Sequence, residues 1–550
     1  MQQIKKPLLI VLFVIIVMNL SRDLFLQFDL TQDKRYSLSE TTLLEINRLD
    51  KPLRIDIFLS GDLPVNYLRF RNELDALVSQ LMYNSDKIVV KYIDPFEGRN
   101  SKDVIQEMKK YGMDPELVIE NKNGNRMESL IFPWMMVNYN NKSELIPLLI
   151  NQLGETENEK ITRSLQQMEY NIMDGIYRVR NSKKKNLAIL TSHNTSKNIK
   201  IVDLLQNLKP YYNLAAFDLK IPEITPEQIL KNLNRFDALI ISNPNEAFSQ
   251  TEKYIFDQYD LQGGKILWMV NGMSIDRDSL FNKMGKAYSL NNELNLDDYF
   301  FHNGIRIQKT LIQDIYCAPI VLARNNDNNA QYIPYPWVYY PLSEPEKTLI
   351  GRDIGPVLTQ FVSSIDTISN SLSKTMLIKS SKFTKTPLAP TLIELNQATK
   401  KIYPSEFNET SKAMGYLIQG KQKSLFKNRI KPFKNKNHLE FGKTEIIIFS
   451  DGNISENQVD KGSPLTLGYD KWTNNFYANR ILIMNSIHFL TGNENRLALR
   501  DKSWKFAILD NQKIKLNGMY IKWLMLLTPI ILILGSGMLN QLLRSKHIDA

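Results

Sequence analysis

The sequence predicts a mixed α/β protein, with two α/β domains lying between two hydrophobic segments. Apolar runs lie near both ends of the chain, and short apolar strands alternate with helical periodicity between them. The chain has 550 residues, of which 43% are hydrophobic, 10% aromatic and 23% charged. At about 100–200 residues per domain this length allows several folding units, and the globular composition excludes a coiled-coil rod, a collagen and a disordered chain.

Charge, hydropathy and cysteine content exclude further classes of protein. The 69 basic and 58 acidic residues leave a formal charge of +11. The mean hydropathy is negative, which excludes a polytopic permease because repeated spans would make the whole chain apolar. Cys317 is the only cysteine. A disulfide framework, a Cys-x-x-Cys pair and a thiolate metal cluster are therefore excluded.

The first hydrophobic segment covers residues 7–20 and follows Lys5 and Lys6. A helix of this length reaches roughly 21 Å, less than the ~30 Å hydrocarbon core, so length leaves open a cleaved signal peptide or a short anchor. The residues that follow lack a small-x-small cleavage site, and residues 24–26 extend the apolar run. We therefore predict an uncleaved transmembrane anchor over residues 7–26.

The second hydrophobic segment, residues 523–539, carries no formal charge and meets the lower length limit for a membrane span. The alternative is a buried core helix, but so uniform a segment has no polar face for solvent. We predict a transmembrane helix over residues 521–541. Basic residues flank both segments, so the positive-inside rule places both termini in the cytoplasm. The bulk of the chain is then expected in the periplasm, on a two-pass protein of the inner membrane.

Residues 50–182 are predicted to form the first α/β domain. Asn140-Asn141 indicates a hairpin turn, and Thr156 with Glu159 forms a capping box before a long closing helix. The resulting order, βαβαβββα, is thioredoxin-like, and the lack of cysteine in this section excludes redox chemistry. The elements expected before the closing helix are strand 53–59, helix 65–83, strand 88–93, helix 103–111, and strands 117–120, 129–138 and 145–150.

Residues 183–294 and 373–515 are predicted to form a doubly wound domain, because near-continuous apolar strands separated by helices indicate a parallel sheet covered on both faces. Residues 295–372, rich in Asn, Pro and Tyr, form an insertion between the two parts. The expected strands are 187–192, 214–219, 238–242, 265–270, 376–379, 414–418 and 445–449. The expected helices are 199–208, 226–233, 250–259 and 475–490.

The carboxyl ends of these strands, where ligands bind in open α/β sheets, carry no familiar catalytic motif. His193 follows the first strand without a nearby Cys, Asp or second His, and the turn at Asn243 lacks a Gly-x-Ser-x-Gly or Gly-x-Cys-x-Gly sequence. The sequence contains no Walker A motif and no metal-ligand spacing among its five histidines. We predict no catalytic residue, no cofactor and no metal, and we interpret Cys317 as a small buried hydrophobe.

Two segments are candidate contact surfaces. Residues 332–342 are rich in aromatic residues and proline, which suits a partner or ligand site, although a rigid loop packed over the sheet is the alternative. Residues 421–436 carry seven basic residues and no acid, which suits anionic headgroups or an acidic partner, although a solvated loop is the alternative. Nucleic acid is not expected as a partner outside the cytoplasm. The predicted contact residues are Tyr335, Trp337, Tyr339, Tyr340, Lys427, Arg429 and Lys431.

Several motifs resemble the GldG family of gliding-motility-associated ABC transporter components in Bacteroidetes-type bacteria. Two of these motifs follow the first hydrophobic segment: Phe28-Asp29-Leu30-Thr31 and Lys34-Arg35-Tyr36-Ser37-Leu38-Ser39. Other segments that resemble the family lie at residues 261–265, 297–300, 336–342 and 363–366. The resemblance spans nearly the whole chain. It implies a substrate-binding-like membrane subunit beside a polytopic permease and, through the permease, a cytoplasmic ATPase. It also implies a glutamine-amidotransferase-like middle domain without the catalytic cysteine.

From these observations we expect a non-catalytic, two-span inner-membrane subunit of an ABC transporter complex that is required for gliding motility. The alternative is a membrane-tethered periplasmic module that binds a small molecule and feeds a permease.

Overall fold

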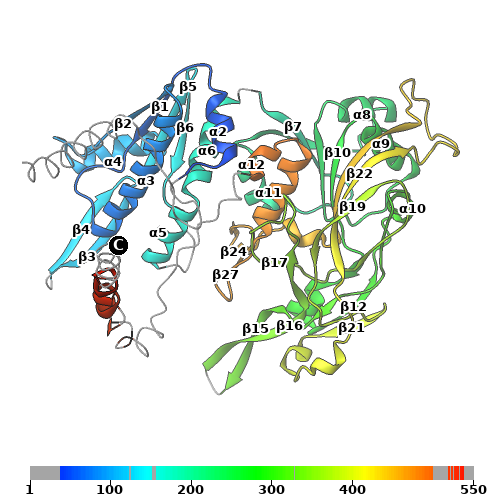
Figure 1. The fold of residues 1–550 in the computed structure, drawn as a ribbon. Helices are drawn as coiled ribbons and strands as arrows, with labels where there is room; N and C mark the ends of the chain where they lie inside the picture. The colour runs from blue at the N-terminus through cyan, green and yellow to red at the C-terminus, as the bar shows by residue number, and fades with distance from the viewer. Residues whose placement is uncertain are drawn as a thin grey trace, which may run out of the picture. The chain divides into compact units, whose positions relative to one another are not determined.

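A computed structural model describes residues 37–122, 125–150, 156–181, 183–326 and 329–498, and residues 518, 520, 522–523, 525–531 and 533–537. The chain divides into two compact units between Ser503 and Trp504. The first unit is mixed α/β, as predicted (Figure 1). The predicted anchor over residues 7–26 lies outside the described residues.

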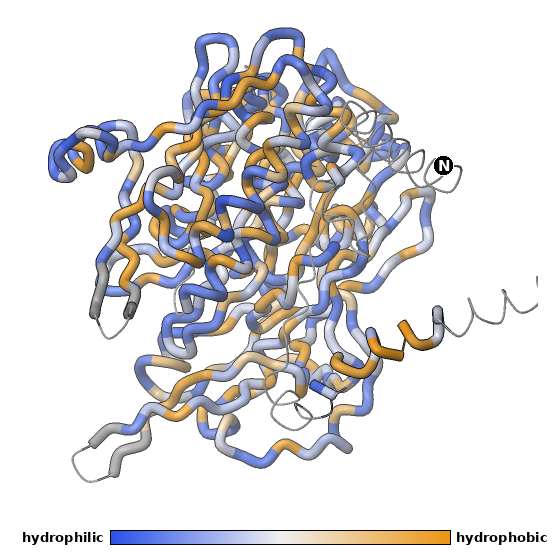
Figure 2. Tube along the Cα trace, turned by 60° about the vertical axis from the view of Figure 1, so that its left-hand side comes forward, coloured by the Kyte–Doolittle hydropathy of each residue, from blue (hydrophilic) through white to orange (hydrophobic). Residues whose placement is uncertain are grey.

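The predicted transmembrane helix over residues 521–541 lies partly outside the described residues. Those described within it are helical, and the side chains of Trp523, Met525 and Ile533 are exposed. Figure 2 colours this segment as largely hydrophobic. Within the described part of the chain, no helix combines the length and the apolar character that crossing a membrane requires.

The first domain is built on a mixed sheet. The strands run in the order β2-β1-β5-β6, with β1 parallel to β2 and antiparallel to β5. This sheet combines a βαβ unit with a ββα unit that follows it along the chain. The thioredoxin-like prediction depends on that combination. The elements are α2 (Glu40–Asn47), β1 (Leu53–Ile57), α3 (Val65–Asn84), β2 (Ile88–Tyr92), α4 (Ser101–Lys110), β3 (Glu116–Lys122), β4 (Asn125–Ile131), β5 (Trp134–Tyr139), β6 (Lys142–Pro147), α5 (Glu157–Gln166) and α6 (Met168–Arg180).

The single strand predicted over residues 129–138 is wrong. Strand β4 ends before Pro133 and β5 begins after it, because proline has no N–H to donate to a sheet. Strand β4 pairs with β3 in a separate hairpin. The predicted turn at Asn140-Asn141 is confirmed between β5 and β6. These residues have φ values of 48° and 60°, the left-handed conformation that a tight hairpin turn requires and asparagine tolerates.

Helix ends in this domain are fixed by specific hydrogen bonds. The capping box of Thr156 and Glu159 is confirmed at the start of α5. The long closing helix is interrupted at Gln167, which separates α5 from α6. At the other end of the domain, Ser39 caps α2, and its N–H donates to the Glu169 carboxylate at 2.8 Å. The last residue of the Lys34-to-Ser39 motif therefore fastens α2 to α6.

The second domain contains the parallel sheet that was predicted. Strands β8-β7-β9-β10-β23 pair in parallel in that order, and β22 continues the sheet in the antiparallel direction. The elements are β7 (Lys185–Leu190), α7 (Asn198–Leu208), β8 (Tyr212–Phe217), α8 (Pro226–Leu233), β9 (Ala238–Ser242), α9 (Gln250–Leu261), β10 (Lys265–Met269), β19 (Ser373–Lys379), β22 (Ala413–Lys423), β23 (Phe441–Phe449), α11 (Asn479–Leu490) and α12 (Glu494–Ala498).

Alternation along these strands produces two cores. On β9, Leu239 and Ile241 pack with residues of α8 and α9, whereas Ala238 and Ile240 pack with residues of α7 and α11. Helices therefore cover both faces of the sheet (Figure 1). Burial on both faces explains why the strands are apolar at nearly every position.

The region predicted as an insertion, residues 295–372, belongs in part to the same sheet. Its long hairpin, β15 (Cys317–Asn326) and β16 (Asn329–Pro345), joins the main sheet because β16 pairs with β19. A separate small sheet lies outside the boundaries predicted for the insertion. It consists of β11 (Met273–Ile275), β12 (Lys286–Asn291) and β21 (Thr391–Glu394). The remaining elements here are η1 (Ser279–Lys283), α10 (Asp297–His302), β13 (Ile305–Ile307), β14 (Gln313–Asp314), β17 (Val357–Leu358), β18 (Ile365–Thr367), β20 (Thr384–Lys385), η2 (Leu395–Thr399) and η3 (Pro404–Glu406).

The predicted helix over residues 475–490 starts later than expected. Helix α11 begins at Asn479, and a short strand, β27, precedes it. The segment between β23 and α11 is a series of short elements: η4 (Gly452–Ser455), β24 (Val459–Asp460), β25 (Ser463–Pro464), β26 (Tyr469–Asp470) and β27 (Asn475–Phe476).

Candidate functional site

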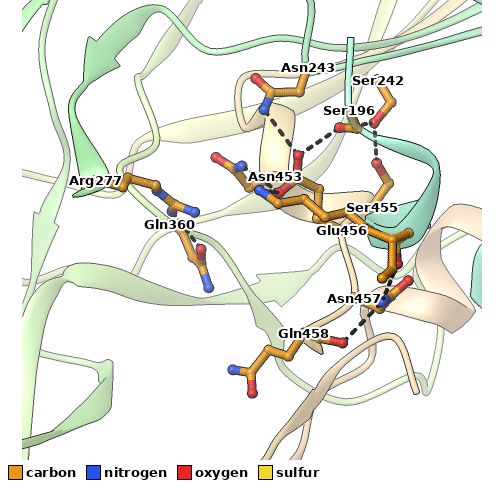
Figure 3. A network of polar contacts seen from close by, with 12 residues as sticks. Ser196, Ser242, Asn243, Arg277, Gln360, Asn453, Ser455, Glu456, Asn457 and Gln458 are labelled. Atoms are coloured by element: carbon orange, nitrogen blue, oxygen red, sulfur yellow. Dashed lines mark hydrogen bonds and ion pairs between the residues drawn. The ribbon is translucent and has the colours of Figure 1, made fainter. Parts of the chain in front are cut away.

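The candidate site lies at the carboxyl ends of the parallel strands. The order β8-β7-β9-β10-β23 places β8 on one side of β7 and the later strands on the other, so the connections reverse between β7 and β9. Ligands of open α/β sheets bind at such a switch point. Polar residues from the segments after β7, β9 and β23 meet there (Figure 3), and Asn271 after β10 is bonded to two of these segments.

Glu456 is the centre of this polar network. Its Oε1 accepts hydrogen bonds from Ser196 Oγ at 2.7 Å and Asn243 Nδ2 at 3.1 Å. Its Oε2 accepts from Lys200 Nζ and from Asn453 Nδ2, both at 3.0 Å. Burial alone would raise the pKa of Glu456, but Lys200 and these hydrogen bonds outweigh it and the pKa is lowered. An ionised carboxylate therefore connects the turns after β7 and β9 to the segment after β23.

Serine hydroxyls extend the network into the protein. The Ser242 Oγ, at the end of β9, lies 2.9 Å from the Ser196 Oγ and 2.8 Å from the Ser455 Oγ. Each hydroxyl can act as donor to one neighbour and acceptor from another, so the three form a continuous chain.

The turn after β23 packs very closely against the turn after β9. Asn271 Nδ2 donates to Asn243 Oδ1 at 2.9 Å, and the Gly452 N–H donates to Asn271 Oδ1 at 2.7 Å. A Cβ at residue 452 would lie 2.5 Å from Asn243 Oδ1 and 3.0 Å from its Cα. Glycine is required at this position because a larger residue would push the two turns apart.

His193 lies below the surface at the end of β7, with only 1% of the residue exposed. Its Nε2 is 3.1 Å from Glu252 Oε1, its Nδ1 is 3.1 Å from Ser192 Oγ, and its ring stacks on Phe248 at 4.0 Å. A hydroxyl, an imidazole and a carboxylate in line can activate a nucleophile. Here burial and stacking favour a structural role, in which His193 fastens the β7 turn to the start of α9.

Asp451 is a second buried carboxylate of the site. It accepts hydrogen bonds from the N–H groups of Gln360 and Asn453, both at 2.8 Å. Burial raises the pKa of Asp451 to about 7, although these N–H groups and the charge of Arg277 act in the opposite direction. Arg277 Nη2 donates to Gln360 Oε1 at 2.6 Å, and its guanidinium lies 5.2 Å from the centre of the Phe361 ring.

A cavity of about 360 Å³ lies beside the network and shares Gln360 with it. Its size is in the range of small-molecule sites, which are typically apolar with a few polar groups for orientation. Aromatic rings, side-chain amides and one carboxylate line it together with aliphatic residues of β15. The aromatic and polar members are Phe281, Tyr340, Trp472, Tyr477, Asn282, Gln360, Gln458 and Asp470. We call this the aromatic pocket.

The aromatic contact residues predicted from the sequence lie on β16, and two of them are in the protein core. Trp337 and Tyr339 are buried, which does not suit the surface role predicted for them. Tyr335 and Tyr340 are half-buried and pack against the same core cluster. Tyr340 also lines the aromatic pocket. The structure therefore separates these residues instead of presenting them as one surface.

The predicted basic contact residues lie on the surface but are partly engaged. Lys427 pairs with Glu440 at 3.1 Å, and Arg429 pairs with Asp298 at 2.7 Å. Lys431 is exposed. Their contact with a partner stays a prediction.

The two phenylalanines within this basic segment attach it to the domain. Phe426 and Phe433 contact the Tyr254 ring of α9, with ring centres 5.0 and 4.9 Å apart. The segment is therefore held against α9 and differs from the freely solvated loop considered as the alternative.

Cys317 is half-buried at the start of β15. Burial raises the pKa of its thiol to about 12, and the charge of Asp314 contributes to the increase. The thiol is therefore protonated at neutral pH, which makes it a poor nucleophile. In the described part of the chain, no group of three or more His, Cys, Asp and Glu side chains is arranged to hold a metal ion.

Residues 184–486, which span the parallel sheet, the polar network and the aromatic pocket, match the family described as an ABC-type uncharacterized transport system. The chain belongs to this family. Membership indicates an accessory role in an ABC-type transport system. Residues 32–138 of this family member also match a domain of unknown function, DUF7088.

Two further proteins are similar to this family member. An uncharacterized protein of Borreliella burgdorferi is 23% identical over 535 residues, which cover 95% of this chain and 94% of that protein. The solved structure of the mmIFT52 N-terminal domain is 13% identical and covers 56% of this chain and 97% of its own, with a TM-score of 0.32.

Proposed function

We propose that this protein is a non-catalytic accessory subunit of an ABC transporter, held at the membrane by its two hydrophobic segments. The observation that carries the proposal is the family match over residues 184–486, which includes the whole candidate site. The network around Glu456 supports the non-catalytic part. Its hydroxyl, amide and carboxylate groups bond to one another, an arrangement suited to holding loops in place.

The membrane part of the proposal comes from the sequence. The apolar segments 7–20 and 523–539 are flanked by lysine or arginine, which favours a two-pass inner-membrane protein with a periplasmic body. The resemblance to the GldG family supports a polytopic permease as the direct partner, an ATPase bound through that permease, and a requirement in gliding motility.

Copurification tests this function. The full-length chain, tagged and expressed at its native level, should be found in the membrane fraction, and after detergent extraction it should retain a polytopic permease and an ABC ATPase. An untagged strain and an unrelated tagged membrane protein are the controls. Deletion of the gene in a gliding host should abolish colony spreading. Recovery from the aqueous fraction, or from detergent without either transporter subunit, would contradict the proposal.

The aromatic pocket favours a second candidate function, a tethered module that binds a small molecule and presents it to the permease. Four aromatic rings offer flat apolar surfaces, and the amides of Gln360 and Gln458 with the carboxylate of Asp470 offer polar contacts. This combination suits a ligand that is polar at its edges and apolar on its faces.

A thermal-shift screen distinguishes the two functions. If the pocket binds a ligand, at least one compound in a panel of sugars, peptides and ions should raise the melting temperature by several degrees. The variant Trp472→Ala should remove that shift because it removes one wall of the pocket. Tyr403→Ala, at an exposed aromatic residue outside the pocket, is the matched control. A shift that persists in Trp472→Ala would exclude this pocket as its cause.

A further inference from the structure

The charges around the aromatic pocket restrict the kind of ligand that it can bind. Among the described residues that line this cavity of about 360 Å³, Asp470 is the only one with a charged side chain. Asp470 is buried, and no described basic residue lies within ion-pair distance of its carboxylate. A bound anion would therefore be repelled by this carboxylate, whereas a bound cation would be attracted.

Two basic residues lie close to the pocket but do not line it. Lys471 pairs with Asp460 at 2.9 Å. The Arg277 guanidinium donates to Gln360 Oε1 at 2.6 Å and lies 5.2 Å from the centre of the Phe361 ring. Both positive charges are therefore engaged by other groups, and neither lines the space that a ligand would occupy.

The polar groups of the pocket already form hydrogen bonds within the protein. Asp470 Oδ1 accepts from Gln458 Nε2 at 3.0 Å, and Gln458 Oε1 accepts from the Lys471 N–H at 3.1 Å. Gln360 Oε1 accepts from Arg277, as described above. A sugar would bring many hydroxyl groups that each need a partner, and a buried polar group without one is costly. A ligand held by charge and apolar contact suits this pocket better.

Four aromatic rings form the rest of the polar and aromatic lining, and they come from segments far apart in the sequence. None of the four stacks on another of them, so each leaves surface for the cavity. The face of an aromatic ring is electrically negative and attracts cations, most strongly for tryptophan. The rings belong to Phe281 of η1, Tyr340 of β16, Trp472 of the turn between β26 and β27, and Tyr477 before α11.

Trp472 has two neighbours outside the pocket. Its ring stacks on Tyr332, with ring centres 6.4 Å apart, and Lys471 Nζ lies 4.9 Å from its centre. Neither neighbour lines the cavity, and Trp472 is 59% exposed. Part of the Trp472 ring is therefore open to a ligand.

The charge of Asp470 acts on two of the other rings. Burial raises the pKa of Tyr477 to about 12, and it also raises the pKa of Tyr340. Asp470 contributes to both increases, whereas Arg277 acts on Tyr340 in the opposite direction. The carboxylate and these two rings are therefore close enough to act on one ligand.

We infer that the aromatic pocket binds a small organic cation with a quaternary ammonium group. The methyl groups of such a cation pack against ring faces, and its charge is attracted by those faces and by Asp470. It has no N–H to donate, so it needs the charge of Asp470 and not a free acceptor. The inference rests on the second candidate function, a tethered module that binds a small molecule, and it names the class of that molecule.

The test compares a cation with an uncharged molecule of the same shape. Choline and 3,3-dimethyl-1-butanol, in which carbon replaces the nitrogen, are titrated by calorimetry into the purified full-length chain in nonionic detergent. Tetramethylammonium tests the ammonium group alone, glucose tests a sugar, and sodium chloride controls for ionic strength. We expect choline and tetramethylammonium to bind, the uncharged alcohol to bind at least about tenfold more weakly than choline, and glucose and sodium chloride to give no binding heat.

Two sets of variants test the groups that hold the cation. Asp470→Asn should weaken choline about tenfold and leave the uncharged alcohol unchanged, because it removes the charge and keeps an oxygen that accepts from Gln458. Glu223→Gln, at an exposed carboxylate outside the pocket, should bind choline like the wild-type protein. Trp472→Leu should weaken choline more than Trp472→Phe does, since phenylalanine keeps an aromatic face. Tyr403→Leu is the control for these.

The inference is overturned if neither cation binds, if the uncharged alcohol binds as tightly as choline, or if Asp470→Asn weakens both equally. Another compound of the thermal-shift screen could instead give a shift that Trp472→Ala removes, with no cation bound. That result would overturn the inference and leave the small-molecule-binding function standing. If no compound binds in the pocket, both fail, whereas copurification tests the accessory role separately.

Discussion

Replacing Trp337 by alanine is expected to lower the free energy of unfolding by about 3–5 kcal/mol, the usual cost of removing a large aromatic side chain from a core. Trp337 is 0% exposed and belongs to a cluster that also contains Met273, Leu311 and Phe361. Its ring centre lies 5.1 Å from that of Tyr339. Urea unfolding of the full-length chain, followed by circular dichroism, measures the change.

The matched control for this substitution is on the same strand. Tyr332 lies on β16 and is 66% exposed, so Tyr332→Ala should change stability by only about 0.5 kcal/mol. Trp337→Phe should fall between the two variants, because the buried Trp337 Nε1 has no hydrogen-bond partner to lose. If Trp337→Ala unfolded like the wild-type protein and instead lost a binding partner, Trp337 would be a contact residue as its sequence context first predicted.

Replacing Asp174 by asparagine is expected to cost about 3–5 kcal/mol, because it removes a buried carboxylate with which a buried arginine pairs. Asp174 of α6 pairs with Arg496 of α12, and both residues are buried, at 6% and 2% exposed. The Arg496 guanidinium also lies 4.0 Å from the centre of the Tyr211 ring, and the Tyr211 hydroxyl donates to Asp174 at 2.6 Å. Loss of the Asp174 charge therefore disrupts contacts of both α6 and α12.

Two comparisons separate the buried pair from charge effects in general. Glu246→Gln removes one partner of the exposed pair with Lys220 and should leave the unfolding midpoint unchanged, since exposed ion pairs contribute little. The double variant Asp174→Leu with Arg496→Leu should be less destabilised than Asp174→Asn, because it removes both charges together. An Asp174→Asn variant as stable as the wild-type protein would show that Arg496 does not depend on Asp174.

The sequence alone determined the elements that depend on local patterns. The parallel strands and helices between β7 and β10 were predicted because each strand is apolar on both faces and each helix has an amphipathic repeat. Strand β9 was predicted with the bounds that the structure shows. The Asn140-Asn141 hairpin and the Thr156–Glu159 capping box were predicted for the same reason, since their signals lie within four residues.

The tertiary structure decided which polar and aromatic residues meet. Glu456 contacts Ser196 and Lys200 across more than two hundred residues, and no local pattern reports such a pairing. Glu252, the partner of His193, comes from α9; its only signal in the sequence is a Ser-x-x-Glu capping box with Ser249. The local composition of residues 332–342 could not show that this segment joins the main sheet through β16.

The placement of residues 332–342 in the main sheet has a simple physical reason. A strand rich in aromatic residues is equally suited to a surface patch and to a core, and only the elements packed against it choose between them. Here β12, β21 and the residues around Phe361 cover one face of β16, which buries Trp337 and Tyr339. Local periodicity therefore determined the helices and strands between β7 and β10, whereas burial and long-range hydrogen bonding determined the candidate sites.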